Sequence, residues 1–465
     1  MAEPLSIATA IGKLLGTGYG LYKAASKHGT DLDLDLNSYK SLVELGGQFQ
    51  SWLPKGASPQ LQAQALAILT AAFGRAFREH FGPRKAFDDP KRLEAHFAAA
   101  IDWARPTERP SPNTPPDSLP ELLADPAKSR YFAALWQSFT MPNLPAKIGD
   151  KFEFDEPLIE KPTGEDRLLF EQIFRRSVMG LLAAPAGRDL SISLLNAKPE
   201  AERAEWAERL IVADMAGWGK RHVFGNVHGH DTLPQMPLAT MYVEPNAVLR
   251  GEYYSGNQSP IRQAVWAALK KNPLVVVTAD FGHGKSLTAR TLAYEAAILF
   301  LATGDKPRAE LVRPVFVKCQ SAVNSTSFEL SRATQRAQWQ DLKELGITAL
   351  RDTDPALLPP PDSQSTLYII DGLDEVAFLE RGVCDFFEHL RGQLTSNHRA
   401  VVFSRPHTIP YGKLKEWEIP VFELRSFDID GTSLGQVGEW LTRWNACSGR
   451  EPIEPTALQQ SGLLE

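Results

Sequence analysis

The segment "ADFGHGKS" at residues 279–286 places two glycines just before a lysine and a serine. Glycine can adopt the backbone angles that point successive N–H groups at one anion, and it lets phosphate oxygens approach closely. The last three residues match the phosphate-binding pattern G-x-x-x-x-G-K-[ST], whereas alanine stands at the first glycine. We therefore expect a nucleotide phosphate cradle formed by Ala279, Asp280, Phe281, Gly282, His283, Gly284, Lys285 and Ser286.

The residues around this segment have the order that a phosphate cradle needs. "PLVVVTA" (273–279) predicts a buried strand before it, and "LTARTLAYEAAILFLATG" (287–304) predicts a helix after it. The alternative is a glycine turn between strand and helix with a chance lysine, but the strand, the helix and the Gly-Lys-Ser residues together favour a cradle. In a cradle, Lys285 would reach the β- and γ-phosphates, and the Ser286 hydroxyl would help to hold Mg²⁺.

Carboxylates follow a second apolar run, "TLYIIDGLDEV" (366–376). Nucleotide hydrolysis needs a carboxylate for Mg²⁺ at the end of a strand next to the cradle, and a group that orients water. Asp371 is the candidate magnesium ligand, and either Asp374 or Glu375 could polarise the attacking water. The alternative is an ordinary polar turn, because Asp and Gly both favour turns.

A third apolar run, "VVFSRP" (401–406), ends in Arg405. An arginine at a strand end beside a nucleotide could contact the γ-phosphate. A surface arginine before a proline turn explains the same residues equally well, so both interpretations of Arg405 stay open.

Short β-branched runs alternate with helical patterns from residue 274 onward. Both faces of these runs are apolar, which is typical of a buried parallel sheet. Alternation with helices such as 383–396 predicts a doubly wound α/β domain. The expected strands lie at 273–279, 313–319, 366–372, 399–405 and 419–424.

The first half of the chain has helical patterns and no strand pattern before residue 240. We expect a helical region at 1–105, a proline-rich linker at 106–120 and a second helical region at 121–238. Among these helices, the patterns at 58–81, 166–184 and 200–218 have apolar residues three and four apart.

Two further groups of residues in this half leave alternatives open. Gly12, Gly16 and Gly20 would line one face of a helix, either for packing in a soluble protein or for membrane contact. The histidine group, with an aspartate beside it, either ligates Zn²⁺ or belongs to a polar loop, and no complete zinc pattern accompanies it. It consists of His222, His228, His230 and Asp231.

Composition and charge exclude several classes of protein. The net charge of −6 provides no general basic surface for nucleic acid. The three cysteines are far apart and form neither a metal motif nor a disulfide framework, which favours a reducing compartment. The N-terminal segment lacks the features of a signal peptide, and Lys13 and Lys23 interrupt its apolar run. We expect a soluble, cytoplasmic protein.

The ordered set "GHGKS", "YIIDGLDE" and "VVFSRP" resembles the NACHT family of STAND-class P-loop NTPases, which includes NLR-like signalling and defence proteins. "DGLDE" is the most specific part, and "MYVEP" (241–245) is similar to the extended segment that often precedes these domains. The resemblance covers roughly residues 240–465. Ala279 and Phe403 depart from the family pattern, but neither change removes a charged group.

This resemblance implies a NACHT-like domain at 239–425 and the start of a helical lid at 426–465. It implies a switch that binds ATP or ADP with Mg²⁺, hydrolyses ATP slowly and forms homo-oligomers once an unknown ligand triggers it. The first half would be an effector or adaptor, with a role in innate immunity, antiviral defence or cell-death signalling. Because "TALQQSGLLE" ends within a helical pattern, we expect a fragment or truncated product.

Two alternatives remain from other classes of protein. One is a P-loop ATPase with fast turnover and a metabolic or remodelling role. The other is an adaptor that binds nucleotide without hydrolysing it.

Overall fold

The structure is a computed structural model, and the chain divides into two units. The first unit comprises residues 1–198 and 301–304, and the second comprises 199–300 and 305–465. The described residues are 163–184, 187–197, 200–221, 236–251, 258–302, 312–322, 328–347, 365–376, 378, 382–427, 435–448 and 451–454, with positions 68, 72, 76, 79 and 80.

Some expectations lie outside the described residues. These are the linker at 106–120, most of the helical region at 1–105, the glycine stripe at Gly12, Gly16 and Gly20, and the histidine group at 222–231.

The described part of the first unit contains the predicted helix at 166–184. This helix, α7 (Gly164–Ala183), begins with a capping box in which Thr163 and Asp166 each accept the other's backbone N–H. Phe170, Phe174 and Val178 are buried at four-residue intervals, so one face of the helix packs inward. The next helix, α8 (Arg188–Ala197), follows directly.

No single helix in the described ranges is long and apolar enough to cross a membrane. By length and composition alone, α7 and the start of α8 would do so only as a pair bent by 94°.

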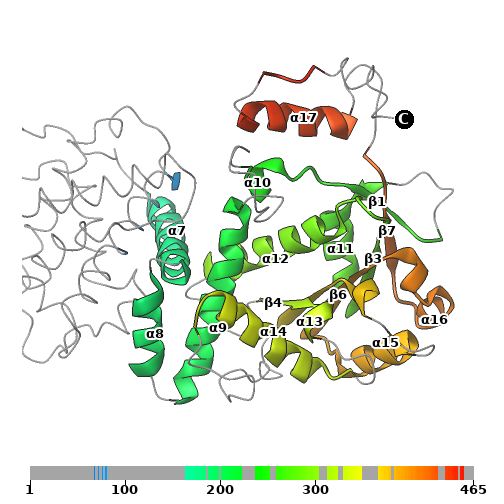
Figure 1. Cartoon of the computed structure of the whole chain (residues 1–465), viewed down its shortest axis with the longest axis horizontal. Coiled ribbons are helices and arrows are strands. Elements are labelled where there is room, and N and C mark those ends of the chain that lie inside the picture. Colours follow the sequence, from blue (N-terminus) through cyan, green and yellow to red (C-terminus); the bar gives the residue numbers. More distant parts are fainter. Residues whose placement is uncertain are drawn as a thin grey trace, which may run out of the picture. The chain divides into compact units, whose positions relative to one another are not determined.

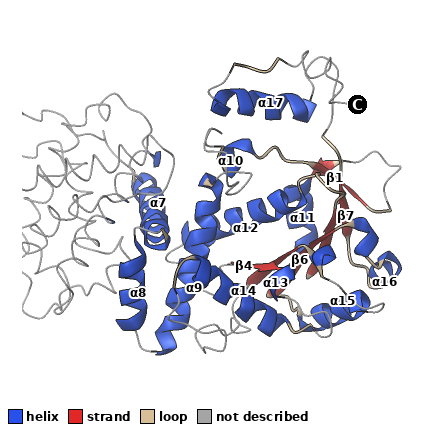
Figure 2. Ribbon diagram, viewed as in Figure 1, coloured by secondary structure: helices blue, strands red, loops and turns tan. Residues whose placement is uncertain are grey.

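A seven-stranded mixed sheet forms the centre of the second unit (Figures 1 and 2). All five predicted strands are present, and they form its parallel part in the order β7-β3-β6-β5-β4. Their bounds are β3 (Leu274–Thr278), β4 (Arg313–Lys318), β5 (Thr366–Asp371), β6 (His398–Ser404) and β7 (Val421–Leu424).

The sheet is not purely parallel, and in this respect the prediction of a parallel sheet was wrong. β1 (Asn246–Leu249) pairs antiparallel with β7, and β2 (Ser259–Pro260) extends that edge. These strands are only four and two residues long, so they provide little periodicity for a sequence to display.

Helices cover both faces of the sheet, as a doubly wound arrangement requires (Figure 1). One face packs side chains such as Val276, Ile370 and Val402 against α14 (Leu330–Glu344), α15 (Gly382–Gln393) and α16 (Tyr411–Glu416). The other face is covered by α11 (Ile261–Leu269), α12 (Lys285–Ala302) and α9 (Glu200–Gly217). Short elements complete the unit: η5 (Trp218–Lys220), α13 (Cys319–Ala322), η8 (Leu373–Glu375) and η9 (Pro406–Thr408).

The helix α9 belongs to the sheet unit, although the sequence predicts it within a separate helical region that ends at residue 238. Glu208 of α9 forms a buried ion pair with Arg313 at the start of β4, with 3.4 Å between Oε1 and Nε. Trp218, just after α9, packs its ring edge-on against Phe316 of β4. A charged pair and an aromatic pair therefore join α9 to β4.

The lid expected at 426–465 contains one described helix, α17 (Gly435–Ser448). Trp440 and Trp444 stack on each other, with 5.2 Å between their ring centroids. Both pack against a buried cluster that includes Met241, the last residue of α10 (Leu238–Met241). Leu287, near the start of α12, packs against the same cluster. The helix α17 thus rests on the chain segment that leads into β1.

Candidate functional site

The loops after β3, β5 and β6 meet at one edge of the sheet. Register pairs Thr278, the last residue of β3, with Ser404, the last residue of β6. The sequence predicts Asp371 on a strand next to β3, but β6 lies between β3 and β5. This prediction was therefore wrong, because crossover connections set the strand order and the sequence does not display them. As a result, Arg405 follows the strand between the other two.

The glycine loop, residues 279–286, has the backbone that the sequence predicts. Gly282 and Gly284 have φ angles of 85° and 77°, values that side chains other than glycine rarely adopt. Among the described residues, the one non-glycine with a positive φ is Glu418, so Ala279 adopts an ordinary conformation. The Ala279 N–H donates to the Ser404 carbonyl, which ties the loop to β6. Alanine is thus compatible with the position of the missing first glycine.

Lys285, Asp374 and Arg405 form one linked group. The Lys285 Nζ donates to Asp374 Oδ1 over 2.6 Å. The Arg405 Nε lies 3.0 Å from Asp374 Oδ2, and the Arg405 backbone N–H donates to Oδ1 over 3.1 Å. The side chain of Asp374 is 4% exposed, so it is almost fully enclosed by these partners. Residues from three separate loops therefore meet at a single carboxylate.

Asp371 lies beside this group and differs from Asp374 in its partners. Its Oδ1 atom is buried and accepts no hydrogen bond from any described residue. Burial raises the pKa of Asp371, and the Ser286 hydroxyl and the Lys285 charge offset this only in part. A buried carboxylate oxygen next to a serine hydroxyl is a donor set that Mg²⁺ accepts. Asp371 and Ser286 are thus chemically suited to hold that ion.

The environment of Asp374 shifts its pKa in the opposite direction to that of Asp371. Its burial acts to raise the pKa. The hydrogen bond and charge of Lys285, together with hydrogen bonds from the backbone N–H groups of Asp374 and Arg405, outweigh that effect and hold the pKa of Asp374 below its usual value. Asp374 is therefore ionised at neutral pH. Cys319 lies near these carboxylates, and burial together with their charges raises the pKa of its thiol, so we assign it no reactive role.

Glu375 is the exposed carboxylate of the site. It belongs to η8, which follows Gly372, and Gly372 has a φ of 79°. A β-carbon at Gly372 would lie 3.0 Å from the Glu375 Cδ atom, so glycine leaves room for that carboxylate. Glu375 forms no ion pair with any described residue. Asp374 is held and Glu375 is free, a difference that the sequence does not reveal.

The remaining cradle residues are at the tip of the loop. Asp280 is exposed, and the Phe281 side chain is 86% exposed. The Arg405 guanidinium carbon lies 5.6 Å from the centre of the Phe281 ring, a cation–π contact between loop and strand end. The buried His283 Nδ1 has no partner among the described residues. Phe281 and His283 thus differ in role: the first touches Arg405, whereas the second has a free polar atom.

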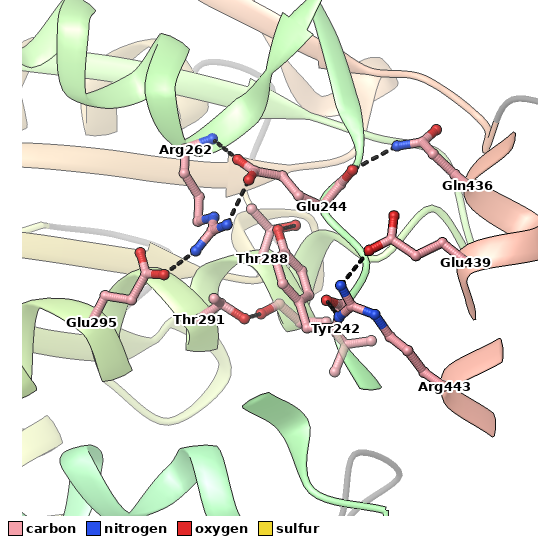
Figure 3. Close-up of polar contacts among 10 residues, drawn as sticks. Tyr242, Glu244, Arg262, Thr288, Thr291, Glu295, Gln436, Glu439 and Arg443 are labelled. Atoms are coloured by element: carbon pink, nitrogen blue, oxygen red, sulfur yellow. Dashed lines mark hydrogen bonds and ion pairs between the residues drawn. The ribbon is translucent and has the colours of Figure 1, made fainter. Parts of the chain in front are cut away.

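The segment that precedes β1 links α17 to α12 (Figure 3). Arg443 of α17 donates to the backbone carbonyls of Thr240 and Tyr242, and Gln436 donates to that of Glu244 over 2.6 Å. On its other side, the buried Tyr242 hydroxyl donates to Thr288 Oγ1 over 3.2 Å. Thr288 lies one turn after Lys285, so α17 and the glycine loop are connected through this segment.

A second connection in the same network consists of charged residues. Glu244 accepts from the Arg262 backbone N–H over 2.8 Å and from its guanidinium over 2.6 Å. Arg262 also pairs with Glu295 in the middle of α12. Arg262 thus bridges the segment before β1 to α12 (Figure 3).

Sequence reasoning missed Gly372, Arg262 and Arg443. The Asp-Gly dipeptide was a usable signal for Gly372, because glycine after aspartate often marks a residue with positive φ. Arg262 and Arg443 carry no such signal. Their partners outside their own helices are 18 to 203 residues away along the chain, so only folding brings them together.

Comparison of this chain with models of known protein families, with characterised proteins and with solved structures returns no match. The resemblance to NACHT domains therefore rests on the motifs themselves, and the arguments for function rest on the geometry of the site.

Proposed function

We propose that residues 239–425 form a P-loop nucleotide-binding domain of the NACHT type, and that the chain is an ATP-binding signalling switch with slow hydrolysis. The observation that carries the proposal is the convergence of Lys285, Asp374 and Arg405 beside the unpartnered oxygen of Asp371. Two cations, a buried ligand oxygen and a loop with positive-φ glycines at one sheet edge suit a magnesium nucleotide.

Each residue has a role that follows from its position. The backbone N–H groups around Gly282 and Gly284 bind phosphate oxygens, and Lys285 adds a positive charge there. Ser286 and Asp371 would hold Mg²⁺, which when bound neutralises phosphate charge. Glu375 orients water, because it is exposed and unpaired, whereas Asp374 is held by two cations. Arg405 contacts the phosphate that ATP has and ADP lacks.

The helix α17 is the start of the lid that reports the nucleotide. Its contacts to the carbonyls of Thr240, Tyr242 and Glu244 connect it to the helix that begins at Lys285. A change in the glycine loop therefore changes the docking of α17, and the two nucleotides favour different positions of the lid.

We also propose how the protein assembles and in which cellular process it acts. The ATP form assembles into homo-oligomers after an unidentified ligand acts, and the protein works in the cytoplasm in immunity, antiviral defence or cell-death signalling. This part rests on the motif resemblance alone. A metabolic ATPase and an adaptor without hydrolysis are the competing functions.

Steady-state ATP turnover, combined with particle size by light scattering, tests the proposal. A switch should turn over slower than about one ATP per second, since typical enzymes reach about 1–1,000 per second. It should also grow in size with ATP and not with ADP. Turnover of tens per second without a change in size would support the metabolic alternative. ATP binding with no turnover, unchanged in Glu375→Gln, would support the adaptor.

A further inference from the structure

Asp374 binds both cations that the proposed function assigns to phosphate. The carboxylate bridges Lys285 Nζ and Arg405 Nε at 2.6 Å and 3.0 Å. It also accepts the Arg405 backbone N–H over 3.1 Å. With its side chain 4% exposed, Asp374 has exchanged its water contacts for these two residues.

A carboxylate and a phosphate compete for partners of this kind. Both present paired anionic oxygens, and both form strong charge-assisted hydrogen bonds with lysine and arginine. A phosphate that approached Lys285 and Arg405 with Asp374 in place would bring like charges together, which is unfavourable. The two anions therefore compete for these two cations.

We propose that Asp374 is an internal competitor for the terminal phosphate of the nucleotide, and that this phosphate displaces it from Lys285 and Arg405. The inference rests on the proposed function and deepens it, because it assigns Asp374 a positioning role and leaves the orientation of water to Glu375. Asp374 holds the two cations at the sheet edge and lowers the affinity of the site for phosphate.

Displacement of Asp374 would let the switch distinguish nucleotides by the number of ion pairs that each one breaks. A nucleotide whose phosphates reach Lys285 and Arg405 together must break both ion pairs, whereas a shorter one leaves the pair with Arg405 in place. The departing carboxylate also releases the Arg405 backbone N–H at the start of η9. The conformation of residues 405–408 therefore depends on the number of phosphates.

Affinity measurements on Asp374→Asn test this proposal. Loss of the competing charge should strengthen the binding of the non-hydrolysable ATP analogue AMP-PNP with Mg²⁺, by about 5- to 150-fold. ADP should gain less, and AMP should not change. Asp385→Asn is the control, because it removes an exposed carboxylate of α15 that has no part in the proposed site, and the affinity of this variant should change about two-fold or less. A gain in affinity cannot arise from damaged folding.

Hydrogen exchange of the unmutated protein is the second measurement. It tests the proposal even if the variant does not fold, because it does not use the variant. When AMP-PNP binds, the Arg405 backbone N–H should exchange faster, because its acceptor Asp374 has left. The amides of residues 282–286 should exchange more slowly in the same sample. A structural effect of ligand binding alone would slow exchange at all of these positions.

The outcomes separate the two proposals. If the unmutated protein binds AMP-PNP while Asp374→Asn binds no more tightly and the Arg405 amide stays protected, the competitor role is wrong and the proposed function stands. If neither protein binds AMP-PNP or ADP, both are overturned. If only Asp374→Asn binds AMP-PNP, while both proteins bind ADP, the competitor role is supported in its strongest form.

Discussion

The carboxylate of Glu375 lies against the backbone of Gly372, so closely that a β-carbon on the glycine would be 3.0 Å from Cδ and 3.1 Å from Oε2. Gly372 also has a φ of 79°, in the left-handed region. This one glycine therefore determines both the turn after β5 and the room available to the exposed carboxylate of the site.

We predict that Gly372→Ala lowers the free energy of unfolding by about 1–2 kcal/mol, the usual cost of a left-handed non-glycine residue. It should also slow ATP turnover, because Glu375 must move. Gly392→Ala is the control: Gly392 is in α15, and nothing lies within 4 Å of an added β-carbon. That change should be neutral or stabilise by up to ~1 kcal/mol. Urea denaturation measures both variants, and equal effects would refute the role of Gly372.

The buried pair of Glu208 and Arg313 should be important for stability. Their side chains are 9% and 4% exposed, so Glu208→Ala would remove a buried carboxylate that pairs with a buried cation. We expect a loss of about 3–5 kcal/mol in the free energy of unfolding. Glu416→Ala breaks the exposed pair with Lys413 and should cost less than about 1 kcal/mol. Comparable losses in the two variants would argue against the joining of α9 to β4.

Asp371 and Asp374 should affect stability in opposite directions. Burial raises the pKa of Asp371 above its ordinary 3.8. Its stabilising contribution is therefore present below pH 3.8 and is lost as the pH rises through the raised value. The pKa of Asp374 is lowered, because Lys285 and the backbone hydrogen bonds together outweigh burial. Its contribution is present above pH 3.8 and is lost as the pH falls through the lowered value.

At pH 7, without Mg²⁺ or nucleotide, Asp371→Asn should therefore raise the melting temperature, and Asp374→Asn should reduce it. Differential scanning calorimetry of the two isosteric variants is the measurement. Shifts of the same sign would show that the assigned environments are wrong. Added Mg²⁺ nucleotide should stabilise the unmutated protein and not Asp371→Asn, since that variant lacks the proposed magnesium ligand.

Arg443 should control the docking of α17. Arg443→Ala loses the hydrogen bonds to the carbonyls of Thr240 and Tyr242. Hydrogen exchange in residues 436–448 should then rise by ~10-fold or more, as expected for loss of charge-assisted hydrogen bonds. Thr442→Ala is the control, because Thr442 bonds only to Gly438 of its own helix. If exchange is unchanged in Arg443→Ala, some other contact holds α17.

The sequence predicted the parts of this fold that repeat locally. The runs that became β3 to β7 are continuous in apolar character, and the glycines of the 279–286 loop follow a known spacing. It did not predict β1 and β2, which are too short to show a period, or the position of β6 between β3 and β5. Strand order depends on which faces are buried together, a property of the whole chain.

The sequence predicted which residues form the candidate site, but it did not predict which of their side chains pair with each other. Lys285, Asp371, Asp374 and Arg405 were each assigned a role from motif order. The sequence could not reveal that Asp374 is the common partner of Lys285 and Arg405, because 89 and 31 residues separate the atoms involved. This arrangement leaves Glu375 exposed and outside these ion pairs, as its proposed role in orienting water requires.

The dissociation constant for ADP with Mg²⁺, measured by calorimetry on the intact chain and on Lys285→Ala, tests the central claim most directly. The account predicts micromolar or tighter binding for the intact chain. It predicts at least a ~30-fold loss for the variant, since removal of one partner of a desolvated charge pair costs about 2–5 kcal/mol. Binding of equal strength in both proteins, or no binding to the intact chain, would contradict it.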